Sequence, residues 1–343
     1  DPSMSPARRW LLLGGAAALL GILALGRART PSRADPPAPD LPEDLDEYLA
    51  EAEARVPDLR AGAQKEILWA DPATRDRTAV AIVYLHGFSA SRLEISPVAE
   101  RVARDLGANL FLTRLAGHGR NGAAMAEPRL ADWLADLAEA VAIGRRIGDR
   151  IVLIGTSTGG TLAYVAAAMP ALRRELLGVA FLSPNFALRA SGEWLLRLPG
   201  ARWILPLVGG RERGFEPRNA AHAAGWTTRY PTASLATLGD LLALARRIPP
   251  EEMHLPAFFA FSPEDSVVDP AAIERIAARW GGPTEVHEVT LGPDDDPSRH
   301  VIAGDILSPG MTDAMVGWLA GWIRRLEQQP DDNQREAERG GAD

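Results

Sequence analysis

The chain has 343 residues, a length that one large α/β domain with accessory segments can fill. Its composition, 46% hydrophobic and 24% charged, is that of a globular protein, and the net charge of −8 gives no basic field for binding nucleic acid. The absence of cysteine excludes disulfides, thiolate nucleophiles and thiolate metal sites, and it leaves the redox compartment open.

The first thirty residues have the pattern of a membrane-targeting segment. Arg8 and Arg9 precede an uncharged run at residues 10–26 (WLLLGGAAALLGILALG). As a helix this run would reach roughly 25 Å, against about 30 Å for a hydrocarbon core, so its length fits either a signal peptide or an anchor. Residues 1–30 are therefore predicted to export the protein or to anchor it to a bacterial membrane. An anchor with the domain on the periplasmic side is favoured, because paired arginines are expected to stay cytoplasmic.

Two changes of composition delimit the folded domain. Residues 31–45 include a proline-rich stretch (PSRADPPAPDLP), which favours an extended linker. Residues 328–343 (QQPDDNQREAERGGAD) have no apolar periodicity and predict a disordered tail. The folded domain is therefore expected at residues 46–327.

Within that domain, short apolar or β-branched runs alternate with amphipathic helical patterns, which is typical of a parallel sheet covered by helices. Residues 185–252 break the alternation, because they contain no strand pattern but several Trp- and Leu-rich amphipathic pieces. They predict a helical cap inserted over the edge of the sheet. The expected strands are residues 79–84, 109–113, 150–154, 179–182, 257–261 and 285–291, and the expected helices are residues 97–106, 130–147, 160–169, 271–280 and 311–326.

The strongest local signal is GTSTG at residues 155–159, directly after an expected strand and directly before an expected helix. Strand, tight turn and helix in this order are the context of a nucleophile elbow, in which flanking glycines let the backbone turn sharply and expose the serine. The alternatives are an ordinary strand-to-helix turn and a phosphate-binding loop, but the latter would end in GK[ST]. Ser157 is therefore the predicted nucleophile.

A serine nucleophile needs a base, and the chain has six histidines. His300 alone lies on a loop after the last expected strand (LGPDDDPSRHV), whereas His287 falls within that strand. An acid to orient the imidazole is expected after the preceding strand, where Glu264, Asp265 and Asp269 compete. Asp269 precedes a proline and a helix and is interpreted as a helix N-cap, which leaves Glu264 or Asp265.

The first central strand runs into His86-Gly87-Phe88 at the carboxyl edge of the sheet, beside the elbow. The backbone amides of Phe88 and Thr158 are predicted to form an oxyanion hole. His86 and His118 are interpreted as histidines that hold loops. The acidic run at residues 294–296 lacks a metal-ligand spacing and is interpreted as a solvated loop, so no metal is expected.

The motifs HGF, AGHG, GTSTGG, SPEDSVVDP and SRHV, in this order, resemble the α/β-hydrolase superfamily, and within it the monoacylglycerol lipase, carboxylesterase and serine aminopeptidase-like group. The resemblance extends over about residues 67–326. It implies an α/β-hydrolase fold, a mostly parallel doubly wound sheet with an inserted helical cap, no cofactor, and ester hydrolysis through an acyl-enzyme. It points to Asp265 as the acid and His300 as the base. Many relatives carry His, Gln or Met where this chain has Thr156 and Thr158. The resemblance is therefore a better guide to the mechanism of this chain than to its substrate class.

The expected activity is that of a serine carboxylic-ester hydrolase acting on a medium-chain ester or a monoacylglycerol. The alternatives are an acyltransferase or serine peptidase with the same triad, and a catalytically inactive binding protein of this fold. The apolar side chains of the cap are expected to form the wall that binds the substrate. The residues chosen for this wall are Trp194, Leu195, Leu198, Trp203 and Leu207.

Overall fold

The computed structural model of the protein describes residue 36 and residues 39–328. The strands are β1 (Glu66–Leu68), β2 (Thr78–Leu85), β3 (Asn109–Leu112), β4 (Gly148–Thr156), β5 (Leu176–Leu182), β6 (Glu212–Gly214), β7 (Arg229–Pro231), β8 (Ala257–Phe261) and β9 (Thr284–Glu288). The helices are α2 (Leu45–Ala54), α3 (Val98–Leu106), α4 (Leu130–Ile147), α5 (Thr158–Ala168), α6 (Pro170–Arg173), α7 (Ala201–Gly209), α8 (Ala220–Gly225), α9 (Leu235–Ala245), α10 (Pro270–Arg279) and α11 (Thr312–Gln328).

The predicted membrane-targeting segment at residues 1–30 lies outside the described residues, as does nearly all of the predicted tail at residues 328–343. In the part of the chain that the structure describes, none of the helices has the length and apolar character needed to cross a membrane.

Seven strands form one sheet in the order β1-β3-β2-β4-β5-β8-β9. All neighbours are parallel except β1, which is antiparallel to β3 at the edge. All six predicted strands are present in this sheet, which confirms the predicted α/β-hydrolase fold class. Because the strands are parallel, their carboxyl ends meet at one edge, where β2 and β4 lie side by side with Leu85 opposite Gly155.

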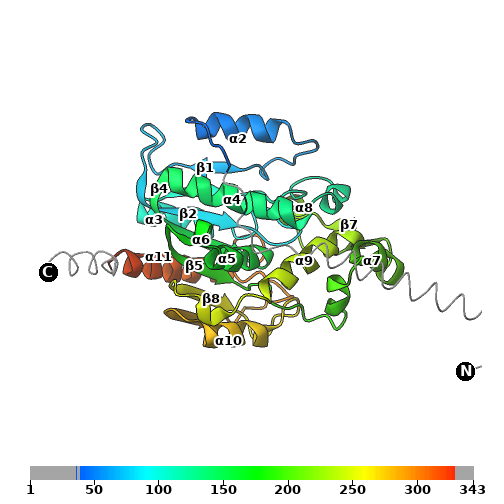
Figure 1. The fold of residues 1–343 in the computed structure, drawn as a ribbon. Coiled ribbons are helices and arrows are strands. Elements are labelled where there is room, and N and C mark those ends of the chain that lie inside the picture. Colours follow the sequence, from blue (N-terminus) through cyan, green and yellow to red (C-terminus); the bar gives the residue numbers. More distant parts are fainter. Residues whose placement is uncertain (1–35, 37–38, 329–343) are drawn as a thin grey trace, which may run out of the picture.

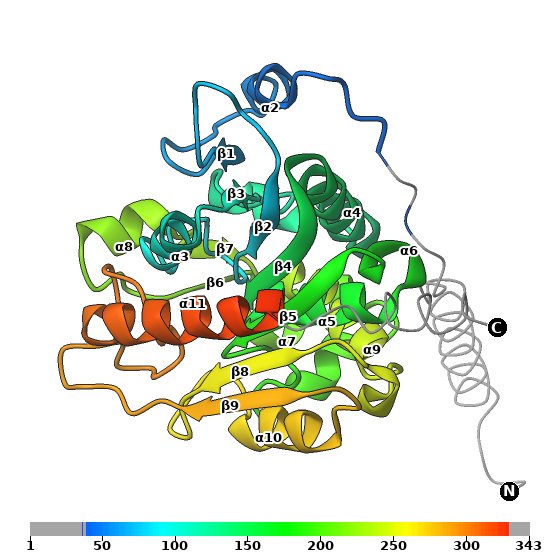
Figure 2. The same ribbon diagram turned by 90° about the vertical axis from the view of Figure 1, so that its left-hand side faces the viewer.

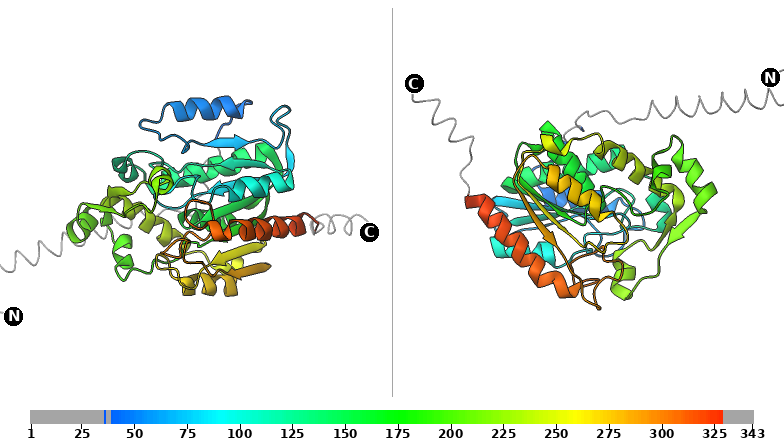
Figure 3. Two further views of the ribbon diagram at one scale, coloured as in Figure 1. Left: turned by 180° about the vertical axis from the view of Figure 1, so that it is seen from behind. Right: turned by 90° about the horizontal axis from the view of Figure 1, so that it is seen from below.

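The sheet is buried on both faces over its central strands, which contribute to two cores, whereas the residues of the edge strand β9 are exposed or half-buried. In β2, Ala81 and Val83 pack on the face covered by α4, α5 and α10, while Ile82 and Tyr84 pack on the face covered by α3 and α11. Figure 1 shows α4 and α5 in front of the sheet, and the view from behind in Figure 3 shows α11 in front of it. This two-sided burial explains why the strand sequences are continuous apolar runs rather than alternating ones.

The segment between β5 and β8 forms a cap on the carboxyl side of the sheet, where α7, α8 and α9 lie to the right in Figure 1. Its helix α9 is almost entirely buried, and Leu241 and Leu242 join the core beneath α4 and α5. The cap also contains an antiparallel pair of short strands, β6 and β7. The expectation that this segment has no strand is therefore wrong: both strands have three residues and no apolar alternation, so they leave no periodic signal.

Two elements at the start of the domain were not expected from the sequence. Helix α2 is capped by the Asp44 side chain, which accepts from the amide of Glu47, and it buries Leu45 and Leu49. Strand β1 pairs with β3, and Figure 2 shows α2 and β1 together at the top of the sheet. An N-cap followed by leucines four residues apart is a helix signal that could have revealed α2.

Candidate active site

Ser157 lies in the sharp turn between β4 and α5, with φ of 51° and ψ of −114°. A side chain rarely adopts a positive φ, so this is the strained conformation expected of a nucleophile elbow. A Cβ atom on Gly155 would overlap the backbone of Gly159, and one on Gly159 would overlap the carbonyl of Leu85. Close packing of β4 against the start of α5 therefore requires glycine at position 155, and close packing of the turn against β2 requires it at position 159. The Ser157 amide donates to the carbonyl of Leu182 at 3.0 Å, which fixes the turn on the neighbouring strand.

His300 and Asp265 meet at the same edge of the sheet. The imidazole Nδ1 of His300 lies 2.8 Å from Oδ2 of Asp265, on the loop that follows β8. The other carboxylate oxygen accepts from the amides of Val267 at 2.7 Å and Val268 at 3.0 Å. Asp265 is fully buried. Because hydrogen bonds hold both of its carboxylate oxygens, the carboxylate has a fixed position and in turn fixes Nδ1 of the imidazole.

The two other carboxylates that competed for this role lie elsewhere. The Glu264 side chain is largely exposed and lies 3.8 Å from Arg299. Asp269 caps α10, as interpreted from the sequence, and its carboxylate accepts from the amide of Ala271 at 3.1 Å. Of the three candidates, the structure therefore brings only Asp265 to His300.

The surroundings of His300 favour its protonated form. Burial lowers the pKa of the imidazole, but the hydrogen bond and the charge of Asp265, together with the charges of Glu94 and Asp296, outweigh that effect and raise it above its usual value. An imidazole with a raised pKa accepts a proton more readily than a free histidine does. His300 thus has the electrostatic environment of a general base.

The buried carboxylate of Asp296 holds the loop that carries His300, although the sequence had suggested a solvated residue at this position. Oδ2 of Asp296 accepts from the amides of His300 at 3.1 Å and Val301 at 2.8 Å, and from the hydroxyl of Ser298 at 2.6 Å. Asp296 and Asp295 are both buried, so the interpretation of this acidic run as a solvated loop is wrong for these two residues. Backbone amides in a tight buried loop need acceptors, and carboxylates supply them here.

The two amides predicted for an oxyanion hole lie beside Ser157. A Cβ on Gly87 would be 3.2 Å from the Cβ of Ser157, so the loop after β2 passes directly against the serine. The next amide, that of Phe88, makes no hydrogen bond within the described part of the chain. Thr158 is the first residue of α5, and its amide is among those at a helix N-terminus that no intrahelical carbonyl accepts. Neither amide has a hydrogen-bond partner among the described residues, and Phe88 and Thr158 both line the cavity with Ser157.

His86 and His118 are buried beside this loop and hold it in place. Nδ1 of His86 lies 2.9 Å from the carbonyl oxygen of Gly87, and its Nε2 accepts from the amide of Leu115 at 3.0 Å. Burial lowers the pKa of His86 to about 4 and lowers that of His118 well below its usual value. Both imidazoles are therefore neutral at pH 7. His118 places Nδ1 3.1 Å from the carbonyl oxygen of Ala116, and its buried Nε2 has no hydrogen-bond partner among the described residues.

Sequence reasoning also missed Glu94, which is buried in the loop between β2 and α3. It accepts from the amide of Gly87 at 2.7 Å and from the hydroxyl of Tyr84 at 2.9 Å. No spacing pattern marks this residue, because its partners come together only when the loop folds back on β2.

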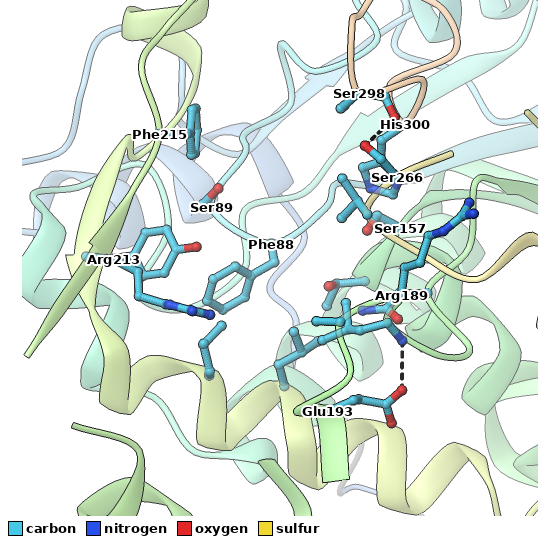
Figure 4. A pocket seen from close by; sticks show the side chains of 18 of the residues that line it. Phe88, Ser89, Ser157, Arg189, Glu193, Arg213, Phe215, Ser266, Ser298 and His300 are labelled. Atoms are coloured by element: carbon cyan, nitrogen blue, oxygen red, sulfur yellow. Dashed lines mark hydrogen bonds between the residues drawn. The ribbon is translucent and has the colours of Figure 1, made fainter. Parts of the chain in front are cut away.

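A cavity of about 970 Å³ opens between the sheet edge and the cap. Ser157 and His300 lie together on one side of it, and Arg213 and Phe215 of the cap lie on the other (Figure 4). The volume is within the range of small-molecule sites. The apolar part of its lining includes Phe88, Leu195, Leu196, Leu205, Val208, Leu235 and Leu238.

Of the five cap residues predicted for the substrate wall, the structure places one at the cavity. Leu195 lines the cavity, but Trp194, Leu198, Trp203 and Leu207 do not. The two tryptophans are 55% and 60% exposed, and Leu207 is 85% exposed. Helical geometry explains the difference, because Leu205 lies two residues, or about 200°, from Trp203 on α7. The leucine faces the cavity while the tryptophan points to the outside.

Among the residues that the structure describes, there is no group of three or more His, Asp or Glu side chains that could hold a metal ion.

With this geometry in view, the chain can be compared with known proteins. A curated relative, the thermostable monoacylglycerol lipase of Bacillus sp. (strain H-257), is 26% identical over 208 residues, which are 60% of this chain and 79% of the relative. A solved structure from work on LipS and LipT, two metagenome-derived lipolytic enzymes, has a TM-score of 0.63 at 21% identity and covers 78% of this chain and 99% of its own. A soluble variant of monoglyceride lipase from Saccharomyces cerevisiae has a TM-score of 0.54 at 13% identity, covering 77% and 91%.

The two structural similarities, at these identities, show a shared fold. The model of the family described as serine aminopeptidase, S33, matches residues 76–289, which contain β2 to β9, the serine turn and the whole cap. Because that match covers more than half of the chain, the protein belongs to the serine aminopeptidase S33 family of α/β-hydrolases.

Proposed function

We propose that this protein is a serine carboxylic-ester hydrolase with Ser157 as the nucleophile, His300 as the base and Asp265 as the acid that orients it. The observation that carries the proposal is the pairing of His300 with Asp265 at 2.8 Å beside a strained serine, at one side of a largely apolar cavity. A buried carboxylate, an imidazole and a serine hydroxyl at a cavity, in this order, are the arrangement of acyl-transfer catalysis.

In the first half of the reaction, His300 takes the proton from the Ser157 hydroxyl through Nε2, since its Nδ1 is held by Asp265. The serine oxygen forms a bond to the ester carbonyl carbon, and the carbonyl electrons move to its oxygen. The amides of Phe88 and Thr158 stabilise that oxyanion. When the carbonyl re-forms, the bond to the alcohol oxygen breaks, and the imidazolium gives its proton to the departing alcohol.

In the second half, His300 removes a proton from water, which attacks the acyl-enzyme and forms a second tetrahedral intermediate on the same two amides. Collapse of this intermediate releases the carboxylic acid and returns the proton to Ser157. The raised pKa of His300 suits both halves, because the imidazole must accept and return one proton in each.

The cavity and the curated relative support the proposed substrate class. The leucine side chains of the cap provide apolar surface beside Ser157, which suits an acyl chain of medium length. The Bacillus relative is named a monoacylglycerol lipase, and this favours a monoacylglycerol or a similar carboxylic ester over transfer to another acceptor or peptide cleavage.

A panel of esters tests this proposal. Purified protein is incubated with p-nitrophenyl esters and monoacylglycerols of increasing acyl length, with the Ser157→Ala variant as the matched control. We expect turnover with a maximum at medium chain lengths and none above background in the variant. Equal rates for the two proteins, or turnover of peptide substrates alone, would contradict the proposal.

We also propose that residues 10–26 attach the protein to a bacterial membrane or export it through one. The proposal rests on the paired arginines before an uncharged run and on the proline-rich stretch after it, which separates the run from the folded domain. Cell fractionation and sequencing of the mature N-terminus test it. A full-length protein in the cytosolic fraction would contradict it, and deletion of residues 1–30 is expected to leave ester turnover unchanged.

A further inference from the structure

Glu94 is a buried carboxylate beside the reacting serine that the scheme above does not use. Its Oε2 accepts from the Gly87 amide at 2.7 Å and from the Tyr84 hydroxyl at 2.9 Å. The same hydroxyl lies 3.1 Å from the Oγ1 of Thr156, the residue before Ser157. One carboxylate thus connects the loop that leads to Phe88 with the strand that leads to the nucleophile.

The other oxygen of Glu94, Oε1, lies on the same side of Gly87 as Ser157. A Cβ on Gly87 would be 2.6 Å from the Oε1 of Glu94 and 3.2 Å from the Cβ of Ser157, so the carboxylate, the glycine and the serine are stacked in contact. Glu94 also lines the cavity together with Ser157 and His300. A Cβ at position 87 would enter this stack, and this explains why the position holds glycine.

We propose that Glu94 is a positioning residue that fixes the oxyanion loop through Gly87 and places a negative charge near His300. Because the Phe88 amide follows directly in the chain, holding Gly87 sets the direction in which that amide points. The charge favours the imidazolium that forms when His300 takes the serine proton. This inference rests on the proposed function, since it assigns a role in the same reaction.

The groups around Glu94 make its charge dependent on pH near neutrality. It faces Tyr84 from β2 and His300 from the loop after β9, and His300 in turn faces Asp265 and Asp296. Burial raises the pKa of Glu94 to about 7, although the Gly87 amide, Tyr84 and His300 oppose the shift. The charge of Glu94 contributes to the raised pKa of His300, so removing it lowers the pH at which the imidazole loses its proton.

Two substitutions separate the positioning of the loop from the charge. Glu94→Gln keeps an oxygen for the Gly87 amide and removes the charge, whereas Glu94→Ala removes both. Glu100→Gln is the matched control, because Glu100 on α3 accepts from the Ser96 hydroxyl at 2.8 Å and does not line the cavity. For each protein, kcat and KM are measured on a soluble ester from about pH 5 to about pH 9. The rate at which a fluorophosphonate labels Ser157 is also measured, and thermal unfolding confirms folding.

We expect Glu94→Ala to lower kcat about 10²-fold with a smaller change in KM, which is the size of effect seen when one oxyanion donor is lost. Glu94→Gln should recover most of kcat, but the acid limb of its kcat/KM profile should move to lower pH. A residue that only supports folding would reduce the folded fraction without moving that limb. Glu100→Gln should match the wild type in both respects.

An acid limb of Glu94→Gln at the wild-type pH overturns the inference, and this variant suffices if Glu94→Ala does not fold. A Glu94→Ala protein that folds and labels at the wild-type rate also overturns it, while leaving the proposed function intact. A wild-type protein that neither labels nor turns over any ester overturns the proposed function and this inference together.

Discussion

The catalytic edge of the sheet and the cap are built from different kinds of contact. At the edge, buried carboxylates accept hydrogen bonds from backbone amides and from an imidazole. These directional bonds fix the position of each partner. The cap contributes apolar side chains to the cavity, and it exposes Trp194, Trp203 and Leu207 on the outside. Removing one partner of a buried hydrogen bond leaves the other unsatisfied, whereas apolar side chains can repack around a substitution. We therefore expect substitutions at the edge to abolish the reaction and those in the cap to change which ester is preferred.

The largest effect is expected from the proposed nucleophile and base. Ser157→Ala and His300→Ala should each lower kcat by roughly 10⁴ to 10⁶, because the members of a triad act as a unit. For the same reason the double variant should lose little more than either single one. Ester kinetics on the three proteins measure this, and additive losses would show that Ser157 and His300 do not share a reaction step.

A smaller loss is expected from the acid. Asp265→Asn should lower kcat by about 10³ to 10⁴, because an amide cannot stabilise the imidazolium as the carboxylate does and favours the wrong tautomer. Asp269→Ala is the control within the same loop and should cost about 1 kcal/mol of unfolding free energy through the lost cap on α10, with unchanged kcat. The reverse ranking in kinetics and thermal unfolding would show that the acid has been misassigned.

The loop that carries His300 offers a way to sharpen the comparison. Asp296→Ala removes the oxygen that accepts from the amides of His300 and Val301, so the base should lose its fixed position and kcat should fall about 10- to 100-fold. The exposed Asp294, two residues earlier, provides the control, and Asp294→Ala should behave as the wild type does. Equal kcat values for the two variants would mean that the buried carboxylate is not needed to place the base.

The smallest effect on rate is expected in the cap. Leu195→Ala shortens a side chain of the cavity wall, so the cavity becomes larger and the preferred acyl length should increase. The value of kcat/KM for the best ester should change only about 2- to 5-fold. Trp203→Ala removes a larger side chain that does not line the cavity, so the preferred length should stay unchanged. A shift with Trp203→Ala but not with Leu195→Ala would reverse the assignment of the inner and outer faces of the cap.

The two regions also differ in how far the sequence predicts them. The strands, the serine turn and the meeting of Asp265 with His300 were predictable, because each has a local pattern and parallel strands bring their carboxyl ends together. Asp296 and Glu94 were not, since they act on backbone amides whose positions depend on how distant loops fold. In the cap, the amphipathic pattern correctly indicated apolar side chains, but it could not tell which face of α7 turns to the cavity, and the tryptophans were placed on the wrong side.

The most direct test of the central claim is to map the site of covalent modification. The wild type and His300→Ala are incubated with a fluorophosphonate, digested and analysed by mass spectrometry. We predict that the adduct forms on Ser157 in the wild type, and that its rate of formation falls at least about 10²-fold without the base. An adduct on another residue, or the same rate in both proteins, would contradict the assignment of Ser157 as a nucleophile activated by His300.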